Sequence, residues 1–403
     1  MNKKNILVAL VLILIIGGGL FLFLRKTPTG EGGPVSNINP FGFSSEQNVE
    51  RAMPQPTDMS GGPVVLATNE SGAVIKKITA TPVAGFTFLG TGTSTSLRYV
   101  EKGTGRINDI GLINPAEVPV RVSTDTQSRV VLAYFLSQGK VVIRFKENDN
   151  GTLTAVFSSL ASTSSSPSKN IPGTILAFDT TAAGDKAVFV LQDGVGSMIT
   201  TANGDGSGAK VLWKSTLQDF VPQGLTKTVA VQTKASRTSS GSFFLLSGGV
   251  PQLYLSGASG FRANISPDTN WAVFSDYENT NSPLQIFDKN KNQRWDIFLA
   301  TLPEKCAWSK VRSEIFYCFE FKGEFLNLPD DWYKGKVFLN ASRLWKISAK
   351  TIQEIVLADM SSLTEAIDPT NLSLSGGDRL LGFINKHDSS LWLVDLTGVR
   401  PLF

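Results

Sequence analysis

Histidine and cysteine are nearly absent from this sequence. Its 403 residues include one histidine, His387, and two cysteines, Cys306 and Cys318. One histidine excludes a histidine-rich metal centre, and a Ser-His-Asp triad would have to use His387 itself. That residue lies in "NKHDSS", and no G-x-S-x-G elbow occurs in the chain to supply a nucleophile. We therefore interpret His387 as an exposed residue between a second and a third strand, and we predict no catalytic residue, no metal site and no cofactor.

A strong net charge of either sign is also lacking. The formal net charge is 38 − 34 = +4, and the basic residues Lys3, Lys4, Arg25 and Lys26 flank one uncharged run. Residues 1–26 contain no acid, so the rest of the chain carries 38 − 4 = 34 basic and 34 acidic groups. Binding to a phosphate backbone needs a clustered basic face. No nucleic-acid partner is predicted.

Charged residues are missing altogether from residues 6–24, which read ILVALVLILIIGGGLFLFL. At about 1.5 Å per residue, this run crosses a hydrocarbon core of about 30 Å. It is longer than the apolar part of a cleaved signal peptide, and no A-x-A-like site follows it. We expect a transmembrane helix over residues 6–24, with residues 1–5 in the cytoplasm and the bulk of the chain at the cell surface or in the periplasm. A cleaved signal and the opposite orientation stay open, because the flanking charges are nearly balanced.

Residues 25–63 are dense in Pro, Gly and Ser and have no sustained apolar period. Such a composition buries too little apolar surface to fold by itself. We expect a linker between the membrane span and a domain over residues 64–403. The alternative is an ordered arm in which Phe41 and Phe43 dock on another surface.

A repeated unit occupies much of residues 64–403. "ANISPDTNWAVF" (263–274) aligns without a gap with "LSLSGGDRLLGF" (372–383), and "LQIFD" (284–288) aligns with "LWLVD" (391–395). A further copy begins at Phe178, and another has Ser309 in the position of the repeated serine. Weaker copies cover residues 86–110, 118–157 and 220–255. Each copy is interpreted as four short strands joined by tight turns. A four-stranded unit that recurs about every 40–50 residues has the spacing of a propeller blade.

The predicted fold is therefore all-β: a β-propeller of about seven four-stranded blades, preceded by one N-terminal transmembrane helix. The segment "GAVIKKI" (72–78) precedes the first copy and has no partner of its own. We expect this strand to pair with the last blade and close the ring, because closure removes exposed sheet edges that invite aggregation.

Two resemblances accompany this pattern. "ISPDTNWAVF…LQIFD" resembles the WD40-like repeats of TolB-type propellers, in which a Ser-Pro-Asp turn opens each blade. "SLRYVEKGTG", "KCAWSKVRSEIFYC" and "PDDWYKG" are similar to segments of membrane-anchored propellers from candidate-phylum bacteria. Both resemblances imply a topology and neither implies an activity, because fold alone does not fix function.

Alignment of the repeats on Ser309 places Cys306 on the innermost strand of its blade and Cys318 on the next strand. In an antiparallel hairpin that turns near Arg312, the two residues face each other with Cβ atoms about 4.5–5.5 Å apart. A small strand movement then permits a disulfide. Two thiols cannot supply the four ligands of a structural zinc site, and the spacing is not that of a redox C-x-x-C motif. We favour a disulfide, with two buried free thiols as the alternative.

Two stretches imitate calcium-binding loops. "NGDGSG" (203–208) and "DKNKN" (288–292) carry oxygen donors at alternate positions, but their twelfth positions are Lys214 and Leu299 instead of the closing Glu. We predict that both are tight turns between the third and fourth strands of a blade.

The loops offer the strongest indication of a functional surface. In a propeller, the loops from second to third strand and the connections between blades open on one face. We call this the insertion face, because the blade that contains the cysteines inserts "FKGEFLNLPDDWYKGKVFLNA" (321–341) there. Aromatic and charged residues on projecting loops favour recognition. The predicted partner-binding residues are Arg237, Tyr277, Asp330, Asp331, Trp332, Tyr333 and Lys334. Alternatively, Trp332 folds back to cap the ring and anchor the insertion.

These features predict a membrane-anchored propeller outside the cytoplasm that acts as a non-catalytic binding or scaffolding module for an envelope protein or glycan. The alternative is a glycan-binding or hydrolytic envelope enzyme that uses the same face. Its candidate residues would be Asp330, Asp331 and Tyr333.

Overall fold

The computed structural model describes residues 64–68, 73–112, 117–123, 126–147, 153–160, 169–277, 284–323, 327–361 and 363–397. The predicted cytoplasmic segment 1–5, membrane span 6–24 and linker 25–63 lie outside these residues. Within the described ranges, no helix combines the length and the apolar character that a membrane crossing requires.

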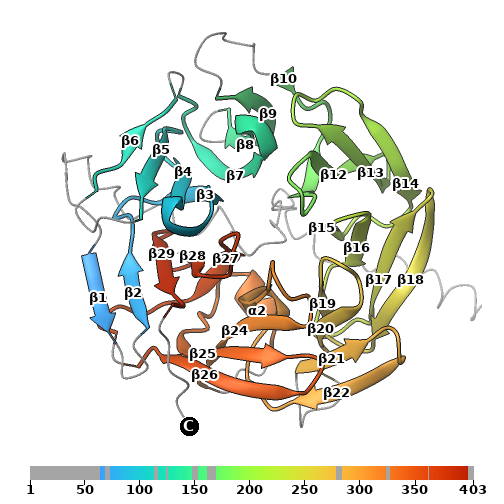
Figure 1. Ribbon diagram of the computed structural model, residues 1–403. Coiled ribbons are helices and arrows are strands. Elements are labelled where there is room, and N and C mark those ends of the chain that lie inside the picture. The colour runs from blue at the N-terminus through green and yellow to red at the C-terminus, as the bar shows by residue number, and fades with distance from the viewer. Residues whose placement is uncertain are drawn as a thin grey trace, which may run out of the picture. The chain divides into compact units, whose positions relative to one another are not determined.

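The described residues form seven antiparallel sheets arranged as blades around a central axis, with the first strand of each blade innermost (Figure 1). The predicted all-β propeller is confirmed. Blade 1 contains β3 (Val83–Leu89), β4 (Ser96–Glu101), β5 (Ile107–Gly111) and β6 (Val120–Arg121). Blade 2 contains β7 (Val130–Leu136), β8 (Lys140–Lys146), β9 (Leu153–Ser159) and β10 (Lys169–Asn170). Blade 3 contains β11 (Ile175–Thr180), β12 (Lys186–Asp193), β13 (Gly196–Asn203) and β14 (Lys210–Ser215).

The remaining blades follow the same plan. Blade 4 contains β15 (Phe220–Gly224), β16 (Val229–Thr233), β17 (Gly241–Ser247) and β18 (Val250–Gly257). Blade 5 contains β19 (Arg262–Ile265), β20 (Trp271–Ser275), β21 (Leu284–Asp288) and β22 (Gln293–Ile297). Blade 6 contains β23 (Cys306–Trp308), β24 (Ile315–Phe321), β25 (Ala341–Ser348) and β26 (Gln353–Asp359). Blade 7 contains β27 (Pro369–Leu374), β28 (Leu380–Asn385) and β29 (Leu391–Asp395), completed by β2 (Val74–Lys77) and β1 (Val64–Thr68).

Among the described residues, short helical turns interrupt this plan at four places: η1 (Gly92–Ser94), η2 (Ser137–Gly139), η3 (Pro303–Lys305) and α2 (Asp330–Tyr333). The structure also corrects one expected blade boundary. The copy predicted over residues 118–157 starts too early, because β6 (Val120–Arg121) pairs with β5 in blade 1 and blade 2 begins at Val130. A two-residue outer strand carries too little apolar pattern to be assigned to its blade from sequence.

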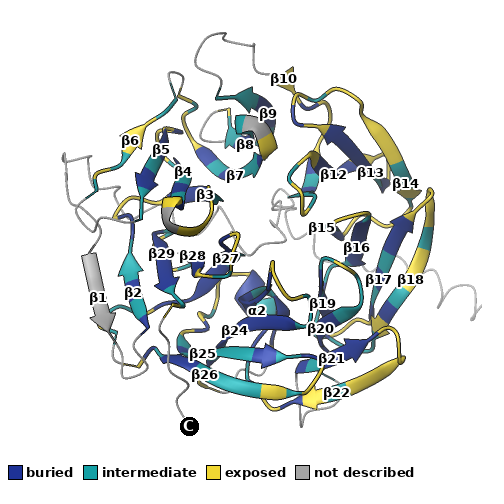
Figure 2. Ribbon diagram, viewed as in Figure 1, coloured by how far each residue is buried: buried dark blue, intermediate teal, exposed yellow. Residues whose placement is uncertain are grey.

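The hydrophobic core lies between neighbouring blades. In one cluster, Val273 and Ile286 of blade 5 pack with Phe316 and Cys318 of blade 6. Middle strands are therefore covered on both faces, and β28 is buried along its whole length. Figure 2 shows inner and middle strands buried, whereas outer strands such as β14, β18 and β22 carry most of the exposed residues. Because each apolar face needs the next blade as a cover, no blade can be stable alone.

The repeated serine closes the turn between the first and second strands. Ser266 Oγ accepts a hydrogen bond from the Trp271 amide at 3.0 Å, and Ser375 Oγ accepts one from the Leu380 amide at 3.0 Å. Ser309 begins a turn that is one residue longer, and its Oγ accepts hydrogen bonds from the Val311 and Arg312 amides within that turn. At all three positions a serine oxygen satisfies backbone donors that the strands leave free.

The ring closes as predicted. Residues 74–77 of β2 pair antiparallel with residues 392–395 of β29, which makes β2 the fourth strand of blade 7, and β1 adds a fifth. Ile75 of β2 is fully buried in the core that blades 6 and 7 share. The first described strands of the chain therefore complete its last sheet.

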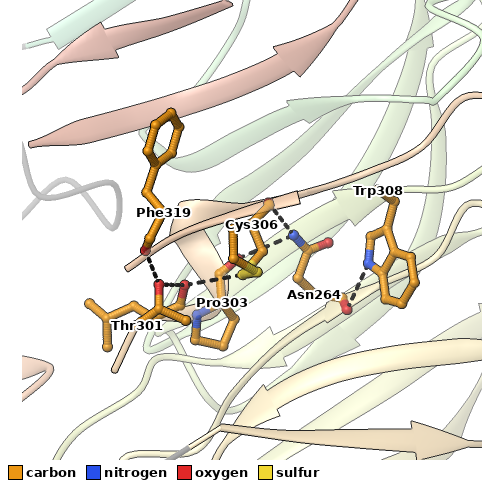
Figure 3. Close-up of a disulfide and its surroundings, with 8 residues drawn as sticks. Asn264, Thr301, Pro303, Cys306, Trp308 and Phe319 are labelled. Carbon is orange, nitrogen blue, oxygen red and sulfur yellow. Dashed lines mark hydrogen bonds between the residues drawn. A yellow bond between two sulfur atoms is a disulfide. The ribbon is translucent and has the colours of Figure 1, made fainter. Parts of the chain in front are cut away.

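The cysteines form a disulfide across the innermost hairpin of blade 6. Cys306 of β23 lies directly opposite Cys318 of β24, with their Cα atoms 4.1 Å apart, and the two sulfur atoms are bonded. Figure 3 shows the bond among Thr301, Pro303 and Asn264, with both cysteines buried. The favoured prediction of a disulfide is confirmed.

Removal of β1 and β2 should prevent ring closure. A chain that begins at Thr81 leaves the backbone edge of β29 unpaired and uncovers apolar surface. We expect this chain to aggregate or to lose its cooperative thermal unfolding, whereas a chain that begins at Pro63 should unfold as the full chain does. Size-exclusion chromatography and thermal unfolding measure both properties. A monomeric, cooperatively unfolding chain from Thr81 would contradict the role of β2.

Candidate functional site

The insertion of blade 6 connects β24 to β25 and contains α2, which Figure 1 shows close to the middle of the ring. It lies on the insertion face. One side of this insertion is buried against the ring and the other is part of the surface. Five of the seven predicted partner-binding residues, 330–334, belong to the insertion, whereas Arg237 and Tyr277 come from loops of blades 4 and 5.

Trp332 is on the buried side and is only 2% exposed. Its Nε1 donates a hydrogen bond to Asp368 Oδ2 at 2.9 Å, and its ring lies 4.1 Å from Lys386 Nζ and 5.0 Å from Lys305 Nζ. Two ammonium groups over one indole ring are cation–π contacts in a desolvated setting. Tyr333 is also buried and donates its hydroxyl hydrogen to Glu304. The arrangement in which Trp332 folds back and anchors the insertion is the one observed.

A buried ion pair holds this anchor. Lys305 and Asp368 contact each other with both side chains almost fully buried. Asp368 also accepts a hydrogen bond from the Leu339 amide at 3.0 Å, so its carboxylate joins the insertion to blades 6 and 7. Burial lowers the pKa of Lys305, and the neighbouring Asp368 opposes that effect. Burial likewise lowers the pKa of Lys386 to about 8.

Three loops meet on the exposed side of the insertion. Asp330 accepts hydrogen bonds from the Arg237 amide at 2.5 Å and from Ser236 Oγ at 3.2 Å. Arg237 donates through Nη1 to the Tyr277 carbonyl at 2.9 Å, and its guanidinium lies 5.1 Å from the Tyr277 ring. Lys334 Nζ lies 3.9 Å from Asp330 Oδ1. Residues from blades 4, 5 and 6 are thereby fixed in one cluster.

A groove of about 490 Å³ lies beside this cluster, between the loop of blade 4 and the insertion of blade 6. Its walls include Asp219, Lys234, Asp330 and Lys334, so charges of both signs line it. Lys334 is among the exposed residues here, with 47% of its side chain accessible. The structure thus brings Arg237, Tyr277, Asp330 and Lys334 together beside a concave surface.

The remaining predicted positions have other surroundings. Asp331 accepts a hydrogen bond from Asn327 at 2.9 Å and lies 3.4 Å from Lys336, and these contacts lower its pKa. His387 is exposed between β28 and β29 as expected, where it stacks on Phe338 and its Nε2 lies 2.7 Å from Asn340 Oδ1. These contacts hold the end of the insertion against the loop between β28 and β29. Partner binding by the seven residues stays a prediction.

Both calcium-like stretches are turns. Asp205 Oδ1 accepts hydrogen bonds from the amide and the hydroxyl of Ser207, between β13 and β14. Asp288 Oδ1 accepts from the amides of Asn290 and Lys291, between β21 and β22. Within the part of the chain that the structure describes, no three His, Cys, Asp or Glu residues gather as potential metal ligands.

Sequence reasoning missed a group of charged residues around the ring axis: Asp179, Arg262 and Glu304. Arg262 is the first residue of β19, and Glu304 lies in η3 directly before β23. A charged residue at the start of a buried strand, or directly before one, is a sequence signal by which Arg262 and Glu304 could have been identified. Their convergence could not be read from sequence, because they belong to different blades.

No family model and no curated protein sequence matches this chain. Solved structures do resemble it. Oligogalacturonate lyase from Vibrio parahaemolyticus has a TM-score of 0.54 at 10% identity, covering 85% of this chain and 100% of that chain. The β-propeller domain of Cps50 (Swd1) from Myceliophteria thermophila has a TM-score of 0.50 at 8% identity, covering 79% and 98%. TolB from Acinetobacter baumannii reaches 0.41 at 10% identity, covering 76% and 78%.

At these identities, the likeness shows the fold alone. The expected β-propeller architecture is confirmed. The resemblance to membrane-anchored propellers of candidate-phylum bacteria stays a prediction.

The variant Asp368→Asn tests the anchor. It keeps an oxygen acceptor for Trp332 but leaves the buried Lys305 ammonium without a counter-charge. Because breaking a buried ion pair costs about 3–5 kcal/mol, we expect the free energy of unfolding to fall by about that amount. Urea unfolding measures it. Asp331→Asn, which changes a partly exposed carboxylate on α2 beside Trp332, should have little effect. Superimposable curves for Asp368→Asn and wild type would show that the pair does not stabilise the fold.

Proposed function

We propose that this protein is anchored in a membrane by residues 6–24 and displays its propeller outside the cytoplasm as a non-catalytic binding or scaffolding module. Its partner would be a protein or glycan of the cell envelope. The uncharged run and the linker composition support the anchor. The disulfide between Cys306 and Cys318 supports an oxidising compartment, because disulfides rarely persist in the cytosol.

The observation that carries the binding role is the loop cluster around Asp330. Its hydrogen bonds tie the loop of blade 4 to the insertion of blade 6, and Arg237 adds Tyr277 of blade 5. A recognition surface needs loops whose positions are fixed before a partner arrives, because ordering them on binding costs affinity. The adjoining groove supplies the concave shape that flat propeller faces lack.

The same contacts argue against catalysis on this face. Asp330 is bound by Arg237 and Ser236, Asp331 by Asn327, and the Tyr333 hydroxyl by Glu304. A general acid–base pair needs carboxyl groups that face a common substrate position. Instead, each candidate of the enzymatic alternative already has a structural partner. We therefore favour a binding role for the exposed residues. The buried Trp332 and Tyr333 anchor the insertion that carries Asp330 and Lys334.

Site-specific photo-crosslinking tests this proposal. A photoreactive amino acid replaces Lys334 in the full-length protein in its native membrane, and a matched control places it at Asn290. Asn290 lies in the turn between β21 and β22, on the opposite face. We expect a discrete crosslinked envelope component from position 334 only. With the photoreactive residue at position 334, the charge reversal Lys234→Glu on the wall of the same groove should lower the yield several-fold, because rim charges mainly affect association.

A crosslinked component that forms equally well from positions 290 and 334, or whose yield from position 334 is unchanged by Lys234→Glu, would contradict a binding role for this face. Digestion of the crosslinked species with a glycosidase or a protease distinguishes a glycan partner from a protein partner.

A further inference from the structure

A central cavity runs along the axis of the propeller and has a volume of about 660 Å³. Every blade contributes to its wall. Trp332 of the insertion lines one end, and the turns that follow β7 and β11 line the other. Its size falls within the range of about 300–1,000 Å³ that is typical of small-molecule sites. The cavity therefore extends from the buried anchor of the insertion towards the opposite face.

Two arginines line this cavity, and their surroundings differ. Arg98 donates a bidentate pair of hydrogen bonds to Asp109, with Nε–Oδ1 and Nη2–Oδ2 distances of 2.6 and 2.7 Å. Arg262 contacts Glu304 through Nε alone, at 3.0 Å. The side chain of Arg262 is 9% exposed, and among the described residues neither of its Nη atoms makes a hydrogen bond. The planar fork of this guanidinium, which matches a carboxylate, is thus unoccupied.

The carboxylates near Arg262 do not offer an equivalent site for a cation. Glu304 Oε1 is shared between Arg262 and the Tyr333 hydroxyl, and Oε2 is shielded from solvent without a hydrogen-bond partner. Asp179 Oδ2 accepts a hydrogen bond from the Gly224 amide at 2.8 Å, and burial raises the pKa of this carboxyl to about 6. The two Nη atoms of Arg262 are therefore the hydrogen-bond donors of this cluster that line the cavity without an acceptor among the described residues.

The wall opposite Arg262 carries aromatic side chains. Phe86 and Phe88 of β3 and Tyr134 of β7 line the cavity there, beside the ion-paired Arg98, whereas Arg262 lies on β19 in blade 5. Most small-molecule sites combine such walls with a few polar groups that fix the orientation of the ligand.

We propose that the central cavity binds a small organic monocarboxylate, whose carboxylate is held by the Arg262 guanidinium and whose apolar body lies against the aromatic wall. The ligand enters from the face opposite the insertion, because Trp332 lines the other end. This site is separate from the loop cluster around Asp330, so either can fail without the other.

Binding of benzoate to the full-length protein in detergent micelles tests the proposal by isothermal titration calorimetry, with benzamide as the uncharged probe. We expect benzoate to bind more tightly than benzamide. Arg262→Gln should weaken benzoate at least about tenfold, because a hydrogen bond to a charged group contributes about 1.5–3 kcal/mol. Partition of the probes into micelles is common to all variants and cancels in the comparison.

Arg98→Gln is the matched control, since Arg98 lines the same cavity but is already bound by Asp109. It should leave the dissociation constant of benzoate within about twofold, well below the tenfold effect that marks a lost charged contact. Arg262→Lys keeps the charge without the fork and should give an intermediate affinity; it decides the question if Arg262→Gln does not fold. Equal binding of benzoate and benzamide, no benzoate binding, or a benzoate affinity that Arg262→Gln or Arg262→Lys leaves at the wild-type value would overturn the proposal.

Discussion

Ring closure is the constraint on which the rest of this structure depends. Each blade buries its faces against its neighbours, so a gap anywhere would expose two apolar surfaces together. The gap is closed by β2, which reaches from the beginning of the described chain to pair with β29 at its end. Because this pairing joins segments more than 300 residues apart, it forms only when all seven blades are in place.

A second set of contacts fixes the innermost strands. Gln232 of blade 4 exchanges two hydrogen bonds with the backbone of Ala263 in blade 5, and Asn264 donates to the carbonyls of Pro303 and Cys306 in blade 6. The disulfide then ties that strand to its own blade, as Figure 3 shows. The ring of first strands is thus a stiff support, and both the insertion and the central cavity are built on it.

Features with a local pattern could be predicted from sequence. The repeated serines, the facing cysteines and the unpaired strand at residues 72–78 each depend on neighbours a few positions away or on one strand register. The direction of Trp332 could not be settled, because its partner Asp368 lies in another blade and burial competes with exposure for any loop tryptophan. The charged cluster at the cavity could not be predicted for the same reason, because Arg262 and Glu304 come into contact only in the folded structure.

The proposed location of the propeller outside the cytoplasm is tested most directly by the redox state of Cys306 and Cys318 in intact cells. Cells are quenched in acid, and the denatured protein is alkylated before and after reduction and weighed by mass spectrometry. An extracytoplasmic propeller predicts that neither cysteine is alkylated before reduction and that both are alkylated after it. Two cysteines that react without reduction would contradict this location, and with it the proposed envelope partner.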